Sequence, residues 1–207
     1  MIDPSPAARL LRTEAAALEP ILRRTPPEAF DRPTVCAGWS VRDVLAHCSS
    51  ALHRVASNDL HGFSPAENQV DVDARRDWPI ERLLEELVAG YPLAADTIAA
   101  AEGRLDKVAL GEWVHGGDVR EPLGARDAYT SAGLDLAIDL FVRFGDRLPA
   151  VRADLPDRTL HFGPESDSPA RLVTDVETLV RLLAGRAPDP ARYRVDGVDP
   201  TALTVFR

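Results

Sequence analysis

Lysine is nearly absent from this sequence. Lys107 is the only lysine among 24 basic residues, and all the others are arginines. This bias is typical of a GC-rich genome and says little about mechanism. Cysteine is also scarce, since Cys36 and Cys48 are the only two. A pair of cysteines in a chain of this length fits a reducing compartment better than a disulfide-stabilised secreted fold.

Long apolar runs are missing as well. No stretch of about 18 apolar residues occurs, so the sequence predicts no transmembrane helix. The N-terminal run MIDPSPAARLLRTEAA lacks the apolar segment of a signal peptide. We therefore expect a cytoplasmic protein without a membrane partner.

Positive charge is in deficit. The formal net charge is −9 and the isoelectric point lies near 5.0. A nucleic-acid-binding domain needs a basic surface against phosphate, so this balance argues against such a partner. The sequence also lacks a G-x-G-x-x-G run, a phosphate loop, a G-x-S-x-G elbow and a C-x-x-C pair. These absences argue against dinucleotide binding, α/β-hydrolase chemistry and a structural zinc knuckle.

Apolar residues are plentiful and follow a helical period. They make up 45% of the 207 residues, enough for one large domain or one domain with a small appendage. The apolar stripes predict a bundle whose helices run from Pro6 to Pro26, Val41 to Val55, Ile80 to Gly103, Val108 to Pro122 and Leu134 to Leu148. Residues 59–77 are polar, show no period and predict a long loop.

The pattern changes after residue 148. Residues 149–156 are expected to form a linker. The run RTLHFG from Arg158 alternates like a short strand, and ARLVT from Ala170 is a second strand able to pair with it. A short helix ending at Gly185 and one or two last strands complete a small α+β region.

One helical stripe carries an unusual pair of residues. Val108, Glu112, His115 and Val119 are spaced four, three and four apart, as on one inward-facing side of a helix. A carboxylate and an imidazole in the middle of such a stripe need a partner, because an unpaired buried charge is costly. A metal ion bound by Glu112 and His115 would supply it. The alternatives are a solvent-facing helix edge or a bond between the two side chains.

Four other residues have chemistry of interest. His47 lies beside the apolar face of its helix, either as a metal ligand or as a histidine bonded at the edge of the core. Asp118 pairs with an arginine or contacts the same site, and Trp113 packs in the core or lines a pocket. Cys36, near a helix start, is a reactive thiol or a simply buried side chain.

Three runs together resemble a known family. CAGWSVRDVLAH, VHGGDVREPLG and LLAGR are similar to motifs of the mycothiol-dependent maleylpyruvate isomerase family, within the DinB-like metal-binding bundles. The resemblance implies a mainly α fold, with a DinB-like four-helix bundle at residues 1–148 and a small C-terminal α+β module at residues 149–207. Mycothiol is an actinobacterial thiol, which is compatible with the arginine-rich composition. A monomer or a homodimer is expected.

The resemblance also implies a metal site. Matching the motifs gives His47 and His115 as ligands of zinc or another divalent metal. The remaining ligand of the family usually lies four residues before the second histidine, where this sequence has Gly111. Glu112 is the nearest substitute, so the predicted ligand set is His47, Glu112 and His115.

The implied partners are mycothiol and a small electrophilic substrate. A zinc ion with three protein ligands keeps an open position, where the mycothiol sulfur would be held as a thiolate. The thiolate then attacks the substrate, either to isomerise it or to remain on the product. Arg120 and Arg186 are predicted to hold a substrate carboxylate, because arginine presents a planar fork to it. Trp113 and Asp118 complete the predicted thiol- and substrate-binding residues.

Two other functions stay open at this point. Gly111 favours a metal-free bundle that serves as a small-molecule-binding or structural protein. A zinc-dependent hydrolase would instead use a metal-bound water and would act without any thiol.

Overall fold

The chain forms two compact units. The computed structural model describes residues 5–60 and 64–206, and the chain divides into the two units between Leu136 and Ala137. This division falls within helix α6 (Leu134–Phe144), whereas the boundary predicted between residues 148 and 149 follows that helix.

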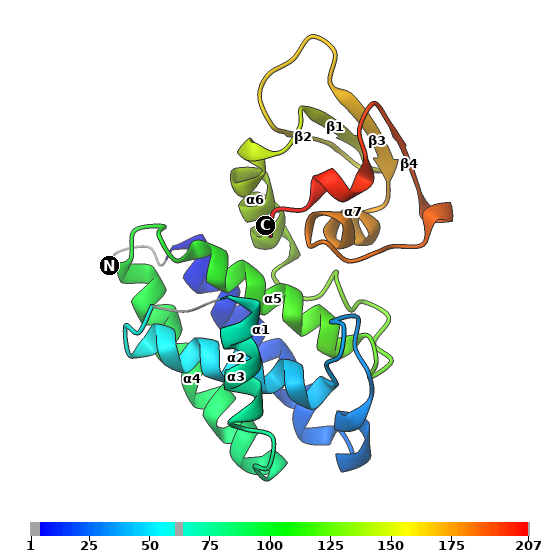
Figure 1. Ribbon diagram of the computed structural model, residues 1–207. Helices are drawn as coiled ribbons and strands as arrows, with labels where there is room; N and C mark the ends of the chain where they lie inside the picture. Colours follow the sequence, from blue (N-terminus) through cyan, green and yellow to red (C-terminus); the bar gives the residue numbers. More distant parts are fainter. Residues whose placement is uncertain (1–4, 61–63, 207) are drawn as a thin grey trace. The chain divides into compact units, whose positions relative to one another are not determined.

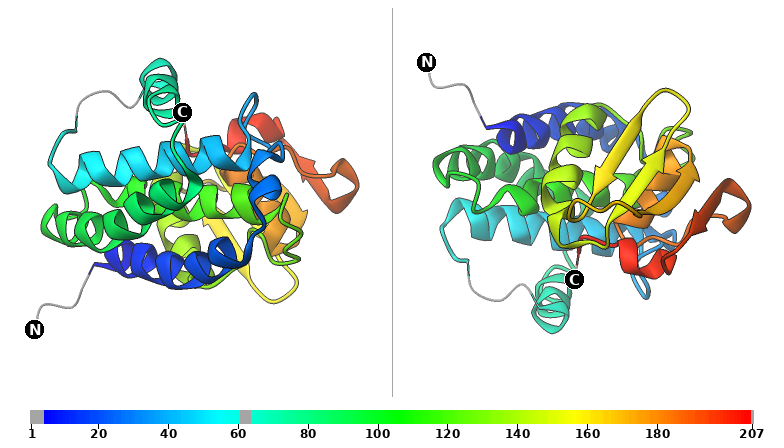
Figure 2. Two further views of the ribbon diagram at one scale, coloured as in Figure 1. Left: turned by 90° about the horizontal axis from the view of Figure 1, so that it is seen from below. Right: turned by 90° about the horizontal axis from the view of Figure 1, so that it is seen from above.

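The first unit is a helix bundle (Figure 1). Its long helices are α1 (Pro6–Arg24), α2 (Val41–Ala56), α4 (Ile80–Ala100) and α5 (Asp106–Arg120). Helix α4 packs against α1 and α2, and α5 packs against the same two helices, so the four surround a common core. Both views of Figure 2 show α1 beside α5. The predicted four-helix bundle is confirmed.

Local signals set the helix starts. Pro6 opens α1, and the Ser5 side chain accepts a hydrogen bond from the Ala8 N–H. At the start of α2, Ser40 accepts from the Asp43 N–H, while the Asp43 carboxylate accepts from the Ser40 N–H. These reciprocal bonds form a capping box, which fixes the direction in which the chain enters α2.

The long loop predicted at residues 59–77 is wrong in part. It contains helix α3 (Pro65–Asp73), which opens with a capping box between Ser64 and Glu67. Within this helix only Val72 is buried, so no apolar stripe reveals it in the sequence. In the sequence, only the capping box and Pro65 indicate the start of this helix.

The second unit contains a four-stranded mixed sheet. Its elements are β1 (Val151–Asp154), β2 (Thr159–Phe162), β3 (Ala170–Thr174), α7 (Val176–Leu183) and β4 (Tyr193–Asp196). The strand order is β2-β1-β3-β4, with β1 antiparallel to β2 and parallel to β3, and β3 antiparallel to β4. Short 3₁₀ helices lie at Pro27–Asp31, Gly145–Arg147, Pro190–Arg192 and Pro200–Leu203.

Two predictions for this unit are corrected. The expected linker at residues 149–156 contains β1, and β3 pairs with β1 and β4 rather than with β2. Ala153 lies opposite Leu160 on one side and Leu172 on the other. Strand β1 lies between Pro149 and Pro156, and these flanking prolines are typical of a linker. Together, the bundle and this small α+β unit confirm the predicted fold class.

No helix in the described part of the chain combines the length and hydropathy that a bilayer span requires.

Candidate functional site

A tight turn before α2 fixes the position of Cys36. The Cys36 N–H donates to Thr34 Oγ1 at 3.1 Å, and the Trp39 N–H donates to the Cys36 carbonyl at 2.9 Å. The Thr34 N–H in turn donates to the Trp39 carbonyl at 3.0 Å. Gly38 has a φ of +81°, a conformation that other residues rarely adopt. These bonds hold Cys36 on a closed turn rather than on a free loop.

The C-terminal half of α5 brings two side chains to this thiol. Asp118 Oδ2 lies 2.9 Å from His115 Nδ1 and accepts a hydrogen bond from Cys36 Sγ at 3.2 Å. The sulfur lies 4.0 Å from His115 Nδ1. Over residues 5–60 and 64–206, this is the one group of three histidine, cysteine or acidic residues whose ligand atoms all lie within 4.8 Å of one another. We name it the Cys36 cluster.

Tyr129 fixes the other side of the Asp118 carboxylate. Its hydroxyl donates to Asp118 Oδ1 at 2.6 Å, and both residues have no exposed surface. A Cβ atom at Gly117 would lie 2.6 Å from Tyr129 Cδ1, so glycine at that position lets the ring lie against α5. With donors at both oxygens, the carboxylate has a fixed orientation.

Tyr129→Phe is expected to lower the free energy of unfolding by about 1–3 kcal/mol, because a buried carboxylate oxygen loses its donor. Urea unfolding measures the change. Tyr193→Phe, at a half-buried residue of the second unit, is the control and should have a smaller effect. Equal stability of Tyr129→Phe and wild type would contradict this role of the hydroxyl.

His47 brings a second imidazole beside the cluster. Its ring centroid lies 5.0 Å from that of His115 and 5.2 Å from that of Trp39. The residue is only 9% exposed, and its Nδ1 has no hydrogen-bond partner. Burial, together with the neighbouring His115, lowers the pKa of His47 to about 3. The ring is therefore neutral at physiological pH, as a metal ligand must be.

Glu112 does not join the two imidazoles. Its carboxylate is buried, bonds the thiol of Cys48 and leaves Oε2 without a partner. Burial raises the pKa of Glu112 to about 8, although the bond from Cys48 opposes this shift. Of the predicted set His47, Glu112 and His115, the structure thus brings the two rings together and directs the carboxyl group to Cys48.

Glu112→Gln is expected to stabilise the metal-free protein increasingly from about pH 4.5 to about pH 8. In this range the folded state keeps the Glu112 proton that the unfolded state releases, so wild-type stability falls as pH rises. Each unit of pKa difference corresponds to about 1.4 kcal/mol. Urea unfolding of both EDTA-treated proteins across this range checks the difference. The same pH slope in both proteins would contradict the raised pKa.

The other predicted residues lie in different surroundings. The Trp113 side chain is 1% exposed and donates from Nε1 to the Ala132 carbonyl at 2.9 Å, so it packs in the core. Arg120 is buried and pairs with Glu14 of α1 at 2.8 Å. Arg186 lies in the second unit, where it donates to the Ala184 carbonyl and lines a cavity of about 360 Å³.

Two residues of the site were not predicted as site residues. Cys36 carried a signal, because it precedes a capped helix in the CAGW run, but the sequence alone left it as a buried or reactive thiol. Tyr129 carried none, since its contact with Asp118 depends on the path of the loop after α5.

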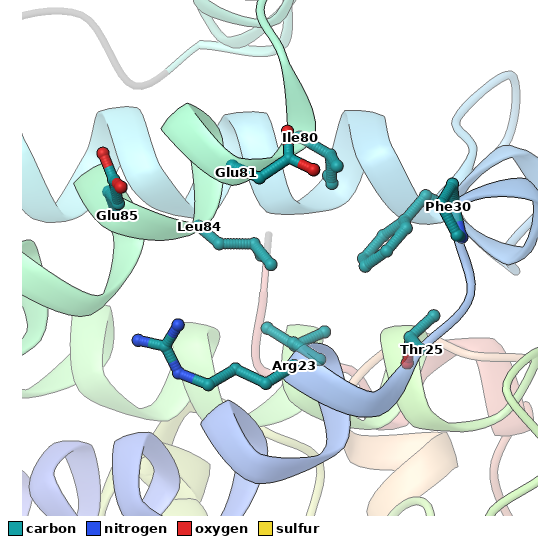
Figure 3. A pocket seen from close by; sticks show the side chains of 9 residues that line it. Arg23, Thr25, Phe30, Ile80, Glu81, Leu84 and Glu85 are labelled. Atoms are coloured by element: carbon teal, nitrogen blue, oxygen red, sulfur yellow. The ribbon is translucent and has the colours of Figure 1, made fainter.

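The first unit also contains a pocket that lies outside the Cys36 cluster. It has a volume of about 420 Å³ and lies where the end of α1 and Phe30 face the start of α4. Figure 3 shows Leu84 and Phe30 pointing into it, with Glu81, Glu85 and Arg23 around them. None of the residues lining it belongs to the Cys36 cluster.

Comparison with known proteins adds a family and a fold. A family model described as the mycothiol maleylpyruvate isomerase N-terminal domain matches residues 11–129, a range that includes the Cys36 cluster. The fold is similar to the crystal structure of the mycothiol-dependent maleylpyruvate isomerase, with a TM-score of 0.56 and 13% identity. A mutant of that enzyme, with a histidine replaced by alanine, gives 0.55 and 12%. Each match covers 94% of this chain and 93% of the other. No curated protein matches the sequence.

Proposed function

Because this chain belongs to the mycothiol maleylpyruvate isomerase N-terminal domain family, we propose that it is a mycothiol-dependent, metal-using enzyme. It isomerises a small electrophilic substrate or transfers the thiol to it. Maleylpyruvate, which the similar crystal structures name, is the first substrate to test.

One observation carries this proposal: several side chains able to bind a metal lie close together, and all of them belong to the residues that match the family model. A thiol, a carboxylate and an imidazole lie together in the Cys36 cluster, and the neutral ring of His47 stands beside it. These side chains come from the turn before α2, from α2 and from α5, which lie far apart in sequence. Side chains of this kind rarely gather inside a helix bundle unless they bind a ligand.

The residues present fit a divalent metal. Nitrogen, sulfur and carboxylate oxygen are the donors that zinc prefers in proteins. The unpartnered Nδ1 of His47 is a buried polar atom that a ligand would satisfy. The ion would be held by ligands drawn from His115, Cys36, Asp118 and the neighbouring His47. When bound, such an ion lowers the pKa of a coordinated thiol, so that the thiolate is available at neutral pH.

The surrounding side chains position these groups. Tyr129 fixes Asp118, and Asp118 in turn holds the His115 ring through Nδ1. Trp39 packs on the His47 ring and donates from Nε1 to Gln69 of α3 at 2.9 Å. The indole therefore covers one side of the nearly buried His47 ring.

The predicted substrate-binding residues divide into two groups. Arg120 and Trp113 already use their polar atoms within the bundle core, so we assign them to packing and to the orientation of α5. Asp118 acts on His115. That Arg186 binds a substrate carboxylate stays a prediction from the sequence, and Arg186→Lys tests it, because lysine keeps the charge but loses the planar fork.

The proposal is tested by turnover of maleylpyruvate with zinc-loaded protein, with and without mycothiol. We expect product only when mycothiol is present, and none when glutathione replaces it. Turnover without any thiol would instead favour the zinc-dependent hydrolase. Absence of turnover together with absence of mycothiol binding in calorimetry would overturn the proposed function, and would favour the metal-free binding protein.

A further inference from the structure

The position four residues before His115 cannot supply a metal ligand in this chain. It is Gly111, and the neighbouring Glu112 uses its carboxylate on Cys48. A site that relied on His47 and His115 alone would lack a third protein ligand, which catalytic zinc sites normally have.

The Cys36 cluster has the dimensions of a small metal site. Ligands of a tetrahedral zinc ion are separated by roughly 3.6 Å for sulfur to nitrogen or oxygen, and by roughly 3.3 Å for nitrogen to oxygen. The corresponding separations are 4.0 Å from Cys36 Sγ to His115 Nδ1, 3.2 Å from Sγ to Asp118 Oδ2, and 2.9 Å from Nδ1 to Oδ2. Shifts of about 0.5 Å per side chain would bring all three atoms onto one ion.

The cluster is also held in place from outside. The turn bonds of Thr34 and Trp39 fix Cys36, and the Tyr129 hydroxyl occupies the second oxygen of Asp118. Hydrogen bonds of this kind orient ligands in metal sites and raise their affinity. His47, nine-tenths buried, adds an unpartnered nitrogen next to His115.

We propose that Cys36 is a metal ligand, and that Cys36 Sγ, His115 Nδ1 and Asp118 Oδ2 bind one thiophilic divalent cation. This inference rests on the proposed function only in taking the Cys36 cluster as the functional site. Of the predicted ligand set it keeps His115, and it replaces Glu112 and His47 by Cys36 and Asp118, with the His47 ring beside the ion. The ligand set mixes sulfur, nitrogen and oxygen, which suits zinc and cobalt and disfavours magnesium and calcium.

Metal binding at this site has a defined proton balance. The Cys36 thiol loses its proton to solvent and binds as a thiolate. His115 binds through Nδ1 in the tautomer that carries its proton on Nε2, so this change of tautomer releases no proton. One proton is therefore released for each ion bound, and the affinity rises with pH below the ordinary thiol pKa of about 8.5.

Cobalt substitution tests the inference without any turnover assay. The protein is stripped with EDTA and titrated with Co²⁺ while the absorption spectrum is recorded. A thiolate bound to Co²⁺ gives a strong near-ultraviolet charge-transfer band, whereas nitrogen and oxygen ligands do not. We expect this band in the wild type and in Cys48→Ala. In Cys36→Ala we expect no band and an affinity lower by at least about 100-fold.

Cys48→Ala is the matched control, because it leaves Cys36 as the only thiol in the sequence. Its band assigns the sulfur even if Cys36→Ala fails to fold. Glu112→Gln should bind Co²⁺ as the wild type does.

Cobalt bound without a thiolate band, or a band that disappears in Cys48→Ala, would overturn the ligand set and leave the proposed function standing. So would a failure to bind Co²⁺ accompanied by mycothiol-dependent turnover. A thiolate band from Cys36 without mycothiol-dependent turnover would overturn the proposed function and leave the metal site standing.

Discussion

His115→Ala is expected to lower mycothiol-dependent turnover by more than about 100-fold, since loss of the orienting partners of a ligand already costs 10–100-fold. His115 contacts every part of the site: Asp118 at 2.9 Å, Cys36 at 4.0 Å and the ring of His47 at a centroid distance of 5.0 Å. Removal of this imidazole leaves the thiol, the carboxylate and His47 without a common partner. Turnover and bound zinc per chain are both measured.

His53→Ala is the control for this experiment. His53 belongs to α2, as His47 does, but its side chain is exposed to solvent. We expect wild-type turnover and zinc content in this variant. If His115→Ala kept both its zinc and its turnover, the assignment of the site to the end of α5 would be wrong.

Glu14→Ala is expected to destabilise the protein by about 3–5 kcal/mol, because it leaves Arg120 buried and uncompensated. Arg120 Nη1 lies 2.8 Å from Glu14 Oε1, Nη2 donates to Oε2 at 3.0 Å, and neither side chain is more than 2% exposed. Burial raises the pKa of Glu14 to about 7 even though Arg120 opposes the shift, which shows how strongly the carboxylate is desolvated. The free energy of unfolding from urea titration measures the loss.

Two further variants separate the loss of the pair from general damage. Glu19→Ala removes the carboxylate from the exposed Arg23–Glu19 pair of the same helix, and should cost less than about 1 kcal/mol. The double variant Glu14→Ala with Arg120→Met removes both buried charges, and should be more stable than Glu14→Ala alone. A double variant no more stable than Glu14→Ala would contradict the coupling of the two charges.

Gly116 explains why this pair fits between the helices. A Cβ atom there would lie 1.8 Å from Glu14 Oε1, so the two glycines in the HGGD run serve two close approaches. Gly116 admits Glu14 from α1, and Gly117 admits Tyr129 from the loop that follows α5. The sequence shows the glycines, but it does not show what approaches them.

Much of the fold was predictable from local pattern. Ser5 with Pro6, and Ser40 with Asp43, marked the starts of α1 and α2, because caps and apolar periods act over a few residues. The elements that were missed lack such patterns. Helix α3 buries a single residue, Val72, and β1 lies between two prolines, Pro149 and Pro156.

The candidate site likewise combines features that the local sequence determines with features that only packing decides. The sequence alone determined that His115 and Asp118 lie one helical turn apart, and that His47 sits on a capped amphipathic helix, because helix geometry fixes both. Only the tertiary structure decided which groups meet them. Cys36 and Tyr129 reach Asp118 from turns 82 residues before it and 11 residues after it. Glu112, one turn before His115, faces Cys48 instead. Helical spacing fixes the direction of a side chain from its own helix, but packing between helices decides what lies at its end.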